Sequence, residues 1–209
     1  MNCIHSKNKQ LLLPLRSAMY DFEEGSVQHE LEKLIASDAK IRMPFPFKDL
    51  IGSEAFFETC YAPLFRSFPD LERRDWIVMA GSTEQNNHWV GCAGHYSGTF
   101  IEPWRDIPAT GHLAHMRFHE FFRFKEGKIV EIQALWDIPE LMMQANAWPM
   151  APSLGLEYHV PGPATLDGQV SGPWNEERSK KSCDLVIEML DIMILPPIQG
   201  LSILHISEP

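Results

Sequence analysis

Apolar and polar side chains alternate over residues 116–124, a pattern typical of a β-strand with two different faces. One face would carry Met116, Phe118, Glu120, Phe122 and Phe124. The other face would carry Arg117, His119, Phe121 and Arg123. A second alternating run follows at residues 129–137, so we predict a hairpin with a two-residue turn at Glu126-Gly127. This turn would place Glu120 opposite Gln133, within reach of a hydrogen bond.

Glu120 carries a charge on the apolar face of this predicted strand. A carboxylate buried beside aromatic rings is costly as an anion, which favours the protonated form and suits proton transfer at neutral pH. We therefore interpret Glu120 as a candidate acid–base residue at the edge of a pocket. The alternative is a structural carboxylate that is paired with Gln133 or with an arginine.

Helical periodicity precedes the strands. An apolar stripe runs along residues 26–35 and consists of Val27, Leu31, Leu34 and Ile35. Ser26 would be the N-cap of this helix. A second helix is expected to start at Ser53, which would supply its cap, and to run through Phe57 and Tyr61 towards Phe65.

Strands are expected at residues 39–43, 75–80 and 88–97, before the hairpin. Because helices come first and antiparallel strands follow, the order predicts an α+β domain in which helices cover one face of a curved sheet. We expect this domain at residues 20–155, after an N-terminal extension of residues 1–19.

The C-terminal part has a different pattern. Two clusters, Pro161-Gly162-Pro163 and Ser171-Gly172-Pro173, mark residues 156–175 as an extended linker. A helix is then predicted at residues 176–195, within a tail of residues 176–209. Its apolar stripe of Val186, Leu190 and Met193 should dock on another surface, because an isolated helix of this length is marginal.

Composition and charge limit the function classes. The chain has 209 residues, of which 44% are hydrophobic and 22% are charged, which is enough for one well-buried core with extra material. A formal net charge of -10 argues against a nucleic-acid surface and favours a small molecule or another copy of the chain as partner. The leucine run at residues 11–15 is too short to span a bilayer and no cleavage pattern follows it, so we expect a cytoplasmic protein.

Several catalytic motifs do not occur in the sequence. The chain has no GxxxxGK loop, GxSxG elbow or HExxH pair, which disfavours nucleotide hydrolysis, serine hydrolysis and zinc proteolysis. Its four cysteines show no CxxC spacing, so free buried thiols are favoured over disulfides or a structural zinc site. We expect neither a metal nor another cofactor.

Two further residues are catalytic candidates, each with a structural alternative. His95 lies in a predicted strand with Gly91, Gly94 and Gly98, which leave room beside a ligand; His95 is then either a second acid or a core histidine. Asp137 either enters the pocket from the end of its strand or caps the following helix, with Glu140 completing a capping box.

Large aromatic side chains are frequent in the sequence. Trp76, Trp89, Trp104, Trp136 and Trp148 either line a pocket for a flat substrate or fill the core, and core packing is the default for such residues. If a pocket is present, we expect it to be lined by Gln133, Trp136, Phe118, Phe122 and Trp104.

Residues 20–160 resemble the SnoaL-like polyketide cyclases, members of the nuclear-transport-factor-like superfamily that includes ketosteroid isomerases. The resemblance is carried by the helix-rich opening and by five stretches: residues 69–72, 94–100, 107–112, 126–131 and 136–144.

The resemblance implies a cone-shaped domain with a deep pocket between sheet and helices, and acid–base chemistry without a cofactor. In such cyclases a carboxylate takes a proton from a carbon next to carbonyl groups, and the enolate attacks a second carbonyl. The family has a His or Asp on the first hairpin strand and an Asp on the final strand. This chain has Glu120 at the first of these positions and Ala134 at the second.

The sequence therefore leaves two alternative functions. The first is a cofactor-free cyclase, isomerase or dehydratase (lyase) acting on a small carbonyl compound, with Glu120 as base and His95 or Asp137 as the second polar group. The second is a non-catalytic module that binds a small apolar ligand or forms a homodimer through the outer face of its sheet.

The tail also bears on the partner. Residues 174–193 resemble the helical start of another domain of the same kind, as in relatives with tandem copies. Alternatively, this helix and the apolar residues 192–204 dock across a dimer.

Overall fold

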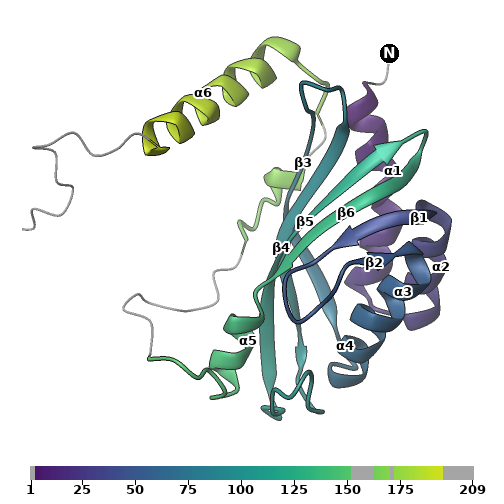
Figure 1. Ribbon diagram of the computed structural model, residues 1–209, viewed down its shortest axis with the longest axis vertical. Helices are drawn as coiled ribbons and strands as arrows, with labels where there is room; N and C mark the ends of the chain where they lie inside the picture. Colours follow the sequence, from purple (N-terminus) through teal and green to yellow (C-terminus); the bar gives the residue numbers. More distant parts are fainter. Residues whose placement is uncertain (1–2, 152–161, 170–171, 195–209) are drawn as a thin grey trace, which may run out of the picture. The chain divides into compact units, whose positions relative to one another are not determined.

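A computed structural model describes residues 3–151, 162–169 and 172–194 of the chain (Figure 1). The chain divides into two compact units, residues 1–172 and residues 173–209. The first unit contains every helix and strand except the last helix, α6. The expected domain end near residue 155, together with Pro161, Ser171 and residues 195–209, lies outside the described residues.

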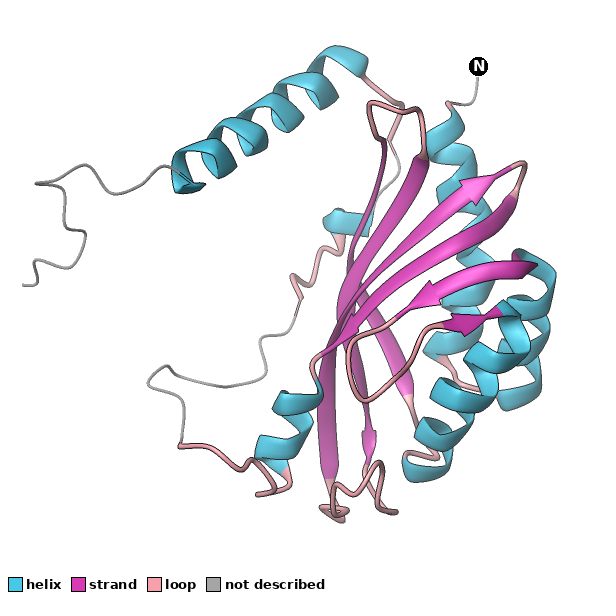
Figure 2. Cartoon of the chain, in the orientation of Figure 1, coloured by secondary structure: helices cyan, strands magenta, loops and turns pink. Residues whose placement is uncertain are grey.

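The first unit contains a single mixed sheet of six strands in the order β2-β1-β6-β5-β4-β3. Neighbouring strands are antiparallel, except that β1 and β6 are parallel. The strands are β1 (Ile35–Arg42), β2 (Leu50–Ile51), β3 (Glu72–Ser82), β4 (His88–Thr99), β5 (Leu113–Lys125) and β6 (Lys128–Trp136). Figure 2 shows that this sheet is curved and that helices α1 to α4 lie on one of its sides. The predicted α+β class is confirmed.

The helices of this unit are α1 (Ile4–Tyr20), α2 (Glu24–Leu34), α3 (Gly52–Phe56), α4 (Ala62–Ser67) and α5 (Ile138–Gln144). Helix α1 was not predicted, because residues 2–10 are polar. Its buried residues Leu12, Leu15 and Met19 are spaced by three and four positions and pack into the core. Residues 4–20 are therefore a structural part of the unit.

Two predicted caps are wrong. The N-cap of α2 is Glu23, whose carboxylate accepts hydrogen bonds from the backbone amides of Gly25 and Ser26. A carboxylate at this place also interacts favourably with the helix dipole. Helix α3 begins at Gly52, so its N-cap residue is Ile51, which makes no side-chain capping hydrogen bond, and Ser53 lies inside the helix.

A π-helical segment, Phe57–Tyr61, joins α3 to α4. Its wider turn brings Phe56, Phe57, Cys60 and Tyr61 to the core side together, and each is at most 2% exposed. This arrangement points the Tyr61 hydroxyl at the sheet, where it lies 3.1 Å from the Tyr96 hydroxyl.

The hairpin of β5 and β6 has the predicted turn but a different register. Glu126 and Gly127 have φ values of 51° and 80°, as a two-residue type I′ turn requires. A bulge follows, because Arg123 pairs with Glu131 and Phe124 pairs with Ile129. The extra residue shifts β6 by one position, so Glu120 lies opposite Ala134 and Gln133 lies opposite Phe121. The predicted pairing of Glu120 with Gln133 is wrong.

The face of the sheet that meets the helices carries the core. On β5 it presents the predicted set Met116, Phe118, Glu120, Phe122 and Phe124, all at most 4% exposed. The opposite, outer face is more exposed and carries the apolar side chains Ile77, Met79, Phe121 and Leu135.

Residues 162–169, which we call the β3-edge segment, pack against β3 although they were predicted as linker. Their last three residues form a short 3-10 helix, Asp167–Gln169. The second unit contains α6 (Glu176–Ile194), close to the predicted range, and its apolar residues Val186, Leu190 and Met193 are 47–72% exposed.

The cysteines are free in the described residues. Cys60 and Cys92 are buried as expected, and burial raises the pKa of both thiols to about 12. Cys183 differs from the expectation because it is exposed on α6. Within the part of the chain that the structure describes, no helix is long and apolar enough to cross a membrane.

Candidate active site

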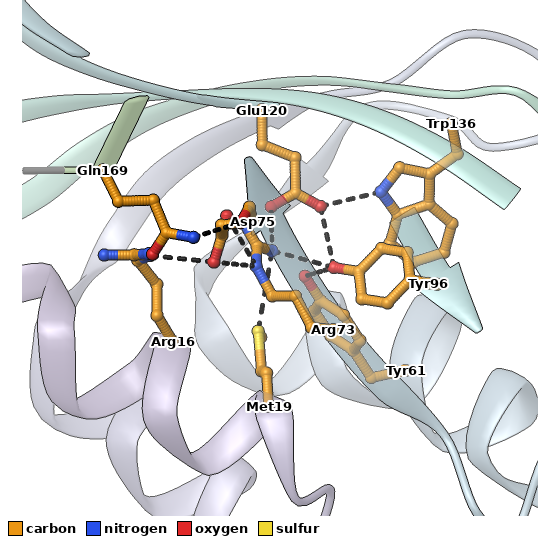
Figure 3. Close-up of polar contacts among 9 residues, drawn as sticks. All are labelled: Arg16, Met19, Tyr61, Arg73, Asp75, Tyr96, Glu120, Trp136 and Gln169. Carbon is orange, nitrogen blue, oxygen red and sulfur yellow. Dashed lines mark hydrogen bonds and ion pairs between the residues drawn. The ribbon is translucent and has the colours of Figure 1, made fainter. Parts of the chain in front are cut away.

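A polar network lies on the inner face of the sheet with Glu120 at its buried end (Figure 3). Glu120 is 0% exposed, and three side chains donate hydrogen bonds to its carboxylate. Arg73 Nη1 lies 2.5 Å from Oε2, while Tyr96 Oη and Trp136 Nε1 lie 2.9 Å and 2.8 Å from Oε1. Both carboxylate oxygens are therefore satisfied within the protein.

Arg73 connects Glu120 to a second carboxylate, Asp75. The Nη2 atom of Arg73 lies 3.0 Å from Asp75 Oδ1, and Arg16 Nε of α1 lies 2.8 Å from Asp75 Oδ2. Arg73 and Asp75 share a face of β3 because they are two positions apart. The network thus alternates two guanidinium groups with two carboxylates, and its formal charge is zero.

Burial and these charges act on the titrating groups. Burial by itself would raise the pKa of Asp75, but the Arg73 and Arg16 guanidinium groups outweigh this and hold the pKa below its usual value of 3.8. Burial, and then the Glu120 carboxylate, raise the pKa of the Tyr96 and Tyr61 hydroxyl groups well above the usual value of 10.0. Asp75 is therefore ionised at neutral pH, and both tyrosines carry their protons.

A cavity of about 740 Å³ borders the outer end of the network. Arg16, Arg73 and Asp75 line it, whereas Glu120 does not. Other lining residues come from α1, from β3, β4 and β5, and from the β3-edge segment; they include Leu13 and Trp76. This volume lies in the range of small-molecule sites, and Asp75 is the buried carboxylate that reaches it.

The space around Glu120 is filled by aromatic rings. The ring of Trp136 lies 5.3 Å from that of Tyr96 and 5.5 Å from those of Tyr61 and Phe47, between centroids. The predicted ligand-binding residues Trp104, Phe118, Phe122 and Trp136 are all at most 2% exposed in this packing. Gln133 is exposed and bonds to Glu131 on the outer face.

His95 is also at the outer face, so the sheet lies between it and Glu120. Its Nε2 atom lies 3.5 Å from Oε1 of Glu140, and the same oxygen lies 3.5 Å from His115 Nε2. The His95 ring stacks on Trp76, with centroids 4.2 Å apart. His95 nevertheless lines the same cavity as Asp75.

Asp137 caps α5, the structural alternative considered for it. Its Oδ1 atom accepts a hydrogen bond of 3.2 Å from the Glu140 amide. The expected capping box is not formed, because the Glu140 carboxylate instead accepts from the backbone amide of Arg117 at 2.6 Å. Burial would raise the pKa of Glu140, but His95 and this amide lower it. The Asp137 carboxylate thus belongs to the cap of α5, whereas Glu120 belongs to the polar network with Arg73, Tyr96 and Trp136.

Sequence reasoning missed Arg73, Asp75, Arg16 and Tyr96. The predicted strand began at Asp75, which left Arg73 outside it. Had the strand been extended by three residues, as in the structure, the alternation would have put Arg73 and Asp75 on one face. Among residues 3–151, 162–169 and 172–194, no group of three His, Cys, Asp or Glu side chains is arranged to hold a metal ion.

The fold agrees with a family match. The sequence model of the SnoaL-like polyketide cyclases matches residues 15–145. The chain belongs to this family. A comparison with curated protein sequences finds no match.

Several solved structures have a similar fold. The SnoaL-like candidate cyclase of Jannaschia sp. CCS1 has a TM-score of 0.56 and 19% identity, over 72% of this chain and 98% of that chain. The candidate hydroxylase AclR of Streptomyces galilaeus has a TM-score of 0.58 and 18% identity, over 72% of this chain and 91% of that chain. The candidate polyketide cyclase IdmH of Streptomyces antibioticus has a TM-score of 0.55 and 20% identity, over 67% of this chain and 99% of that chain. At these identities the likeness concerns the fold.

Proposed function

We propose that the chain is a cofactor-free acid–base enzyme of the polyketide cyclase type, acting on a small carbonyl compound in the cavity beside β3. The observation that carries this proposal is the position of Asp75. It is the buried carboxylate that lines a cavity of about 740 Å³, and Arg16 and Arg73 line the same cavity. Membership of the cyclase family supports the reaction type.

In the proposed reaction, Asp75 takes a proton from a carbon next to a carbonyl group. The resulting enolate oxygen is stabilised by the Arg16 guanidinium group, and the enolate carbon attacks a second carbonyl of the same substrate. The alkoxide formed in this step takes the proton back from Asp75. In an isomerisation, no attack would occur and Asp75 would return the proton to a different carbon of the conjugated enolate. In a dehydration, the enolate would expel a β-hydroxyl group, which would take the proton from Asp75 and leave as water.

The lowered pKa of Asp75 limits the substrates. A carboxylate held by two guanidinium groups is a weak base, so it can remove only an acidic proton. A carbon between two carbonyl groups is such an acid, because both carbonyl groups share the charge of the enolate. We therefore propose a 1,3-dicarbonyl compound as substrate.

Glu120 takes a different part in this proposal from the one expected from the sequence. It is sealed by packing and bonds to Arg73, so it would act as a positioning residue that holds Arg73 between two carboxylates. Proton transfer by Glu120, His95 or Asp137 stays a prediction that activity measurements on variants can decide.

Deuterium exchange tests the proposal without knowledge of the natural substrate. A panel of 2-alkyl-3-oxo esters would be incubated with the protein in D2O, and loss of the proton between the carbonyl groups followed by NMR. Asp75→Asn should remove at least about 99% of the protein-dependent rate, whereas Asp38→Asn, an exposed control on β1, should leave it unchanged. Equal rates for wild type and Asp75→Asn would refute the role of Asp75.

A non-catalytic binding module is the second candidate function. It is favoured by the aromatic packing around Glu120, which fills the part of the fold where the family resemblance implies a pocket. In that case panel compounds would bind and shift the melting temperature, but exchange would proceed at the rate of the buffer.

We also propose that the protein is a cytoplasmic homodimer. The exposed apolar side chains on the outer sheet face and on α6 support self-association. Leu135→Glu or Leu190→Glu should then lower the solution mass measured by light scattering. A wild-type monomer would refute the dimer.

A further inference from the structure

The cavity has a wall that lies outside the part of the chain matched by the family. The match ends at residue 145, and the β3-edge segment comprises residues 162–169. Gly162, Pro163, Ala164, Leu166 and Gln169 of this segment all line the cavity. The remaining lining residues belong to α1, β3, β4 and β5.

Two glycines allow this segment to lie directly on β3. A Cβ atom at Gly162 would overlap the indole ring of Trp76. A Cβ atom at Gly168 would overlap the backbone carbonyl oxygen of Trp76. Neither residue has room for a side chain, so the close approach of the two backbones depends on glycine at both positions.

Gln169, the last residue of the segment, forms hydrogen bonds with the polar network (Figure 3). Its Oε1 atom accepts a hydrogen bond of 2.7 Å from Arg16 Nη2, and its Nε2 atom donates to the backbone carbonyl of Asp75. Arg16 in turn donates from Nε to Asp75 Oδ2 at 2.8 Å. The guanidinium group is therefore held from two sides, and Gln169 fixes its plane relative to the carboxylate.

We infer that the β3-edge segment is part of the ligand site: Gln169 positions Arg16 beside Asp75, and Pro163, Ala164 and Leu166 form the wall for the apolar body of the ligand. This inference rests on the proposed function for the role of Arg16. The ligand class that fits is a compound with an apolar body and a carbonyl or enolate oxygen at one end. The apolar body would lie between Leu166 and Leu13, and the oxygen would face Arg16.

Gly168→Ala tests the wall, and Gly172→Ala is its matched control. Gly172 has no atom within 4 Å of a built Cβ, so its replacement should leave the segment in place. Gly168→Ala should raise hydrogen–deuterium exchange in residues 162–169 and weaken binding of a 2-alkyl-3-oxo ester by about tenfold or more in full-length protein. Unchanged melting temperature and near-UV circular dichroism would show that the rest of the fold is intact.

Gln169→Met tests the positioning role. Methionine keeps the length of the side chain but neither accepts from Arg16 as an amide does nor donates to Asp75. We expect kcat for deuterium exchange to fall about 10–100-fold while KM changes less than about threefold, because misplacement of a catalytic group acts on the reaction step. Gln169→Glu keeps the acceptor for Arg16 and should restore part of kcat.

The outcomes separate this inference from the proposed function. If Gly168→Ala binds the ester and exchanges amide hydrogen as Gly172→Ala does, the wall is refuted. If no ester of the panel binds wild type, the ligand class is refuted. Loss of affinity in Gly168→Ala without ester deuteration by wild type would support the wall and refute the catalytic function. Equal kcat for Gln169→Met and wild type would refute the positioning role.

Discussion

Replacing Arg73 by methionine would remove the cation that joins both buried carboxylates of the network. Arg73 is 1% exposed, and its partners Glu120 and Asp75 are 0% and 7% exposed. Methionine fills much of the same space without charge, so the change tests charge pairing more than packing. Glu120 would keep its hydrogen bonds from Tyr96 and Trp136 but would lose its ion pair with Arg73, whose Nη1 atom lies 2.5 Å from Glu120 Oε2.

The cost follows from the burial of the two carboxylates. Breaking a buried ion pair by removing one partner costs about 3–5 kcal/mol, because a charge is left uncompensated in a medium of low polarity. Asp75 keeps Arg16 at 2.8 Å, so most of this cost should come from Glu120. A domain of this size unfolds with a free energy of about 5–15 kcal/mol, so the variant should lose a large part of its stability.

A double-mutant cycle shows whether the cost comes from the charge pair. Glu120→Gln alone should cost about 1–3 kcal/mol, since Arg73 keeps Asp75 as its partner. The double variant Arg73→Met/Glu120→Gln leaves no uncompensated charge at Glu120, so it should be more stable than the sum of the single changes by about 2 kcal/mol. Urea unfolding at pH 7, followed by tryptophan fluorescence, measures the free energies of unfolding of wild type and of the three variants.

Arg74→Met is the matched control for this prediction. Arg74 is the next residue on β3, but its side chain is 54% exposed and pairs with Glu72 at the surface. Its replacement should change the free energy of unfolding by less than about 1 kcal/mol. A cost for Arg73→Met that equals that of the control, or strict additivity in the cycle, would refute the reasoning.

Two further predictions concern the sheet and the acid stability. Gly94→Ala should destabilise the protein by about 2–4 kcal/mol, because the new Cβ would overlap the backbone carbonyl of Arg74, whereas Gly81→Ala on β3 meets nothing within 4 Å and should be nearly neutral; equal melting temperatures would contradict this. The folded-state pKa values of Asp75 and Glu140 lie below the ordinary values of 3.8 and 4.5, so both carboxylates stabilise the fold at neutral pH, and this contribution is lost as the pH falls through the folded-state pKa. Glu140→Gln should therefore flatten the decline of unfolding free energy between about pH 5 and pH 2 in urea titrations, and an unchanged slope would argue against a lowered pKa.

Local patterns allowed correct predictions where the cause is local. The two faces of β5 follow from the two-residue period of a strand, and the turn follows from the left-handed φ that Gly127 adopts readily. The register of β6 could not be predicted in this way. It depends on a bulge at Val130, for which the sequence has no glycine or proline signal.

The sequence analysis considered an arginine as partner of Glu120, but which arginine could not be predicted, for a different reason. Arg73 is 47 residues away in the chain, and the pairing arises because β4 lies between β3 and β5 in the sheet. The contact of Gln169 with Arg16 spans 153 residues and a region that was predicted as linker. The first contact follows from strand order and the second from the packing of residues 162–169 beside β3 and α1, and a single sequence determines neither.

The residues at positions 120, 134 and 73 can be understood together through their charges. Ala134 lies directly opposite Glu120, so an acid at this position would put two carboxylates on neighbouring strands of a buried face. Like charges at this distance repel, and one carboxylate would hold a proton. With alanine at position 134, Glu120 instead pairs with Arg73, which fixes the guanidinium group beside Asp75. The absence of the second acid thus accompanies a network in which Asp75, and not Glu120, lines the cavity.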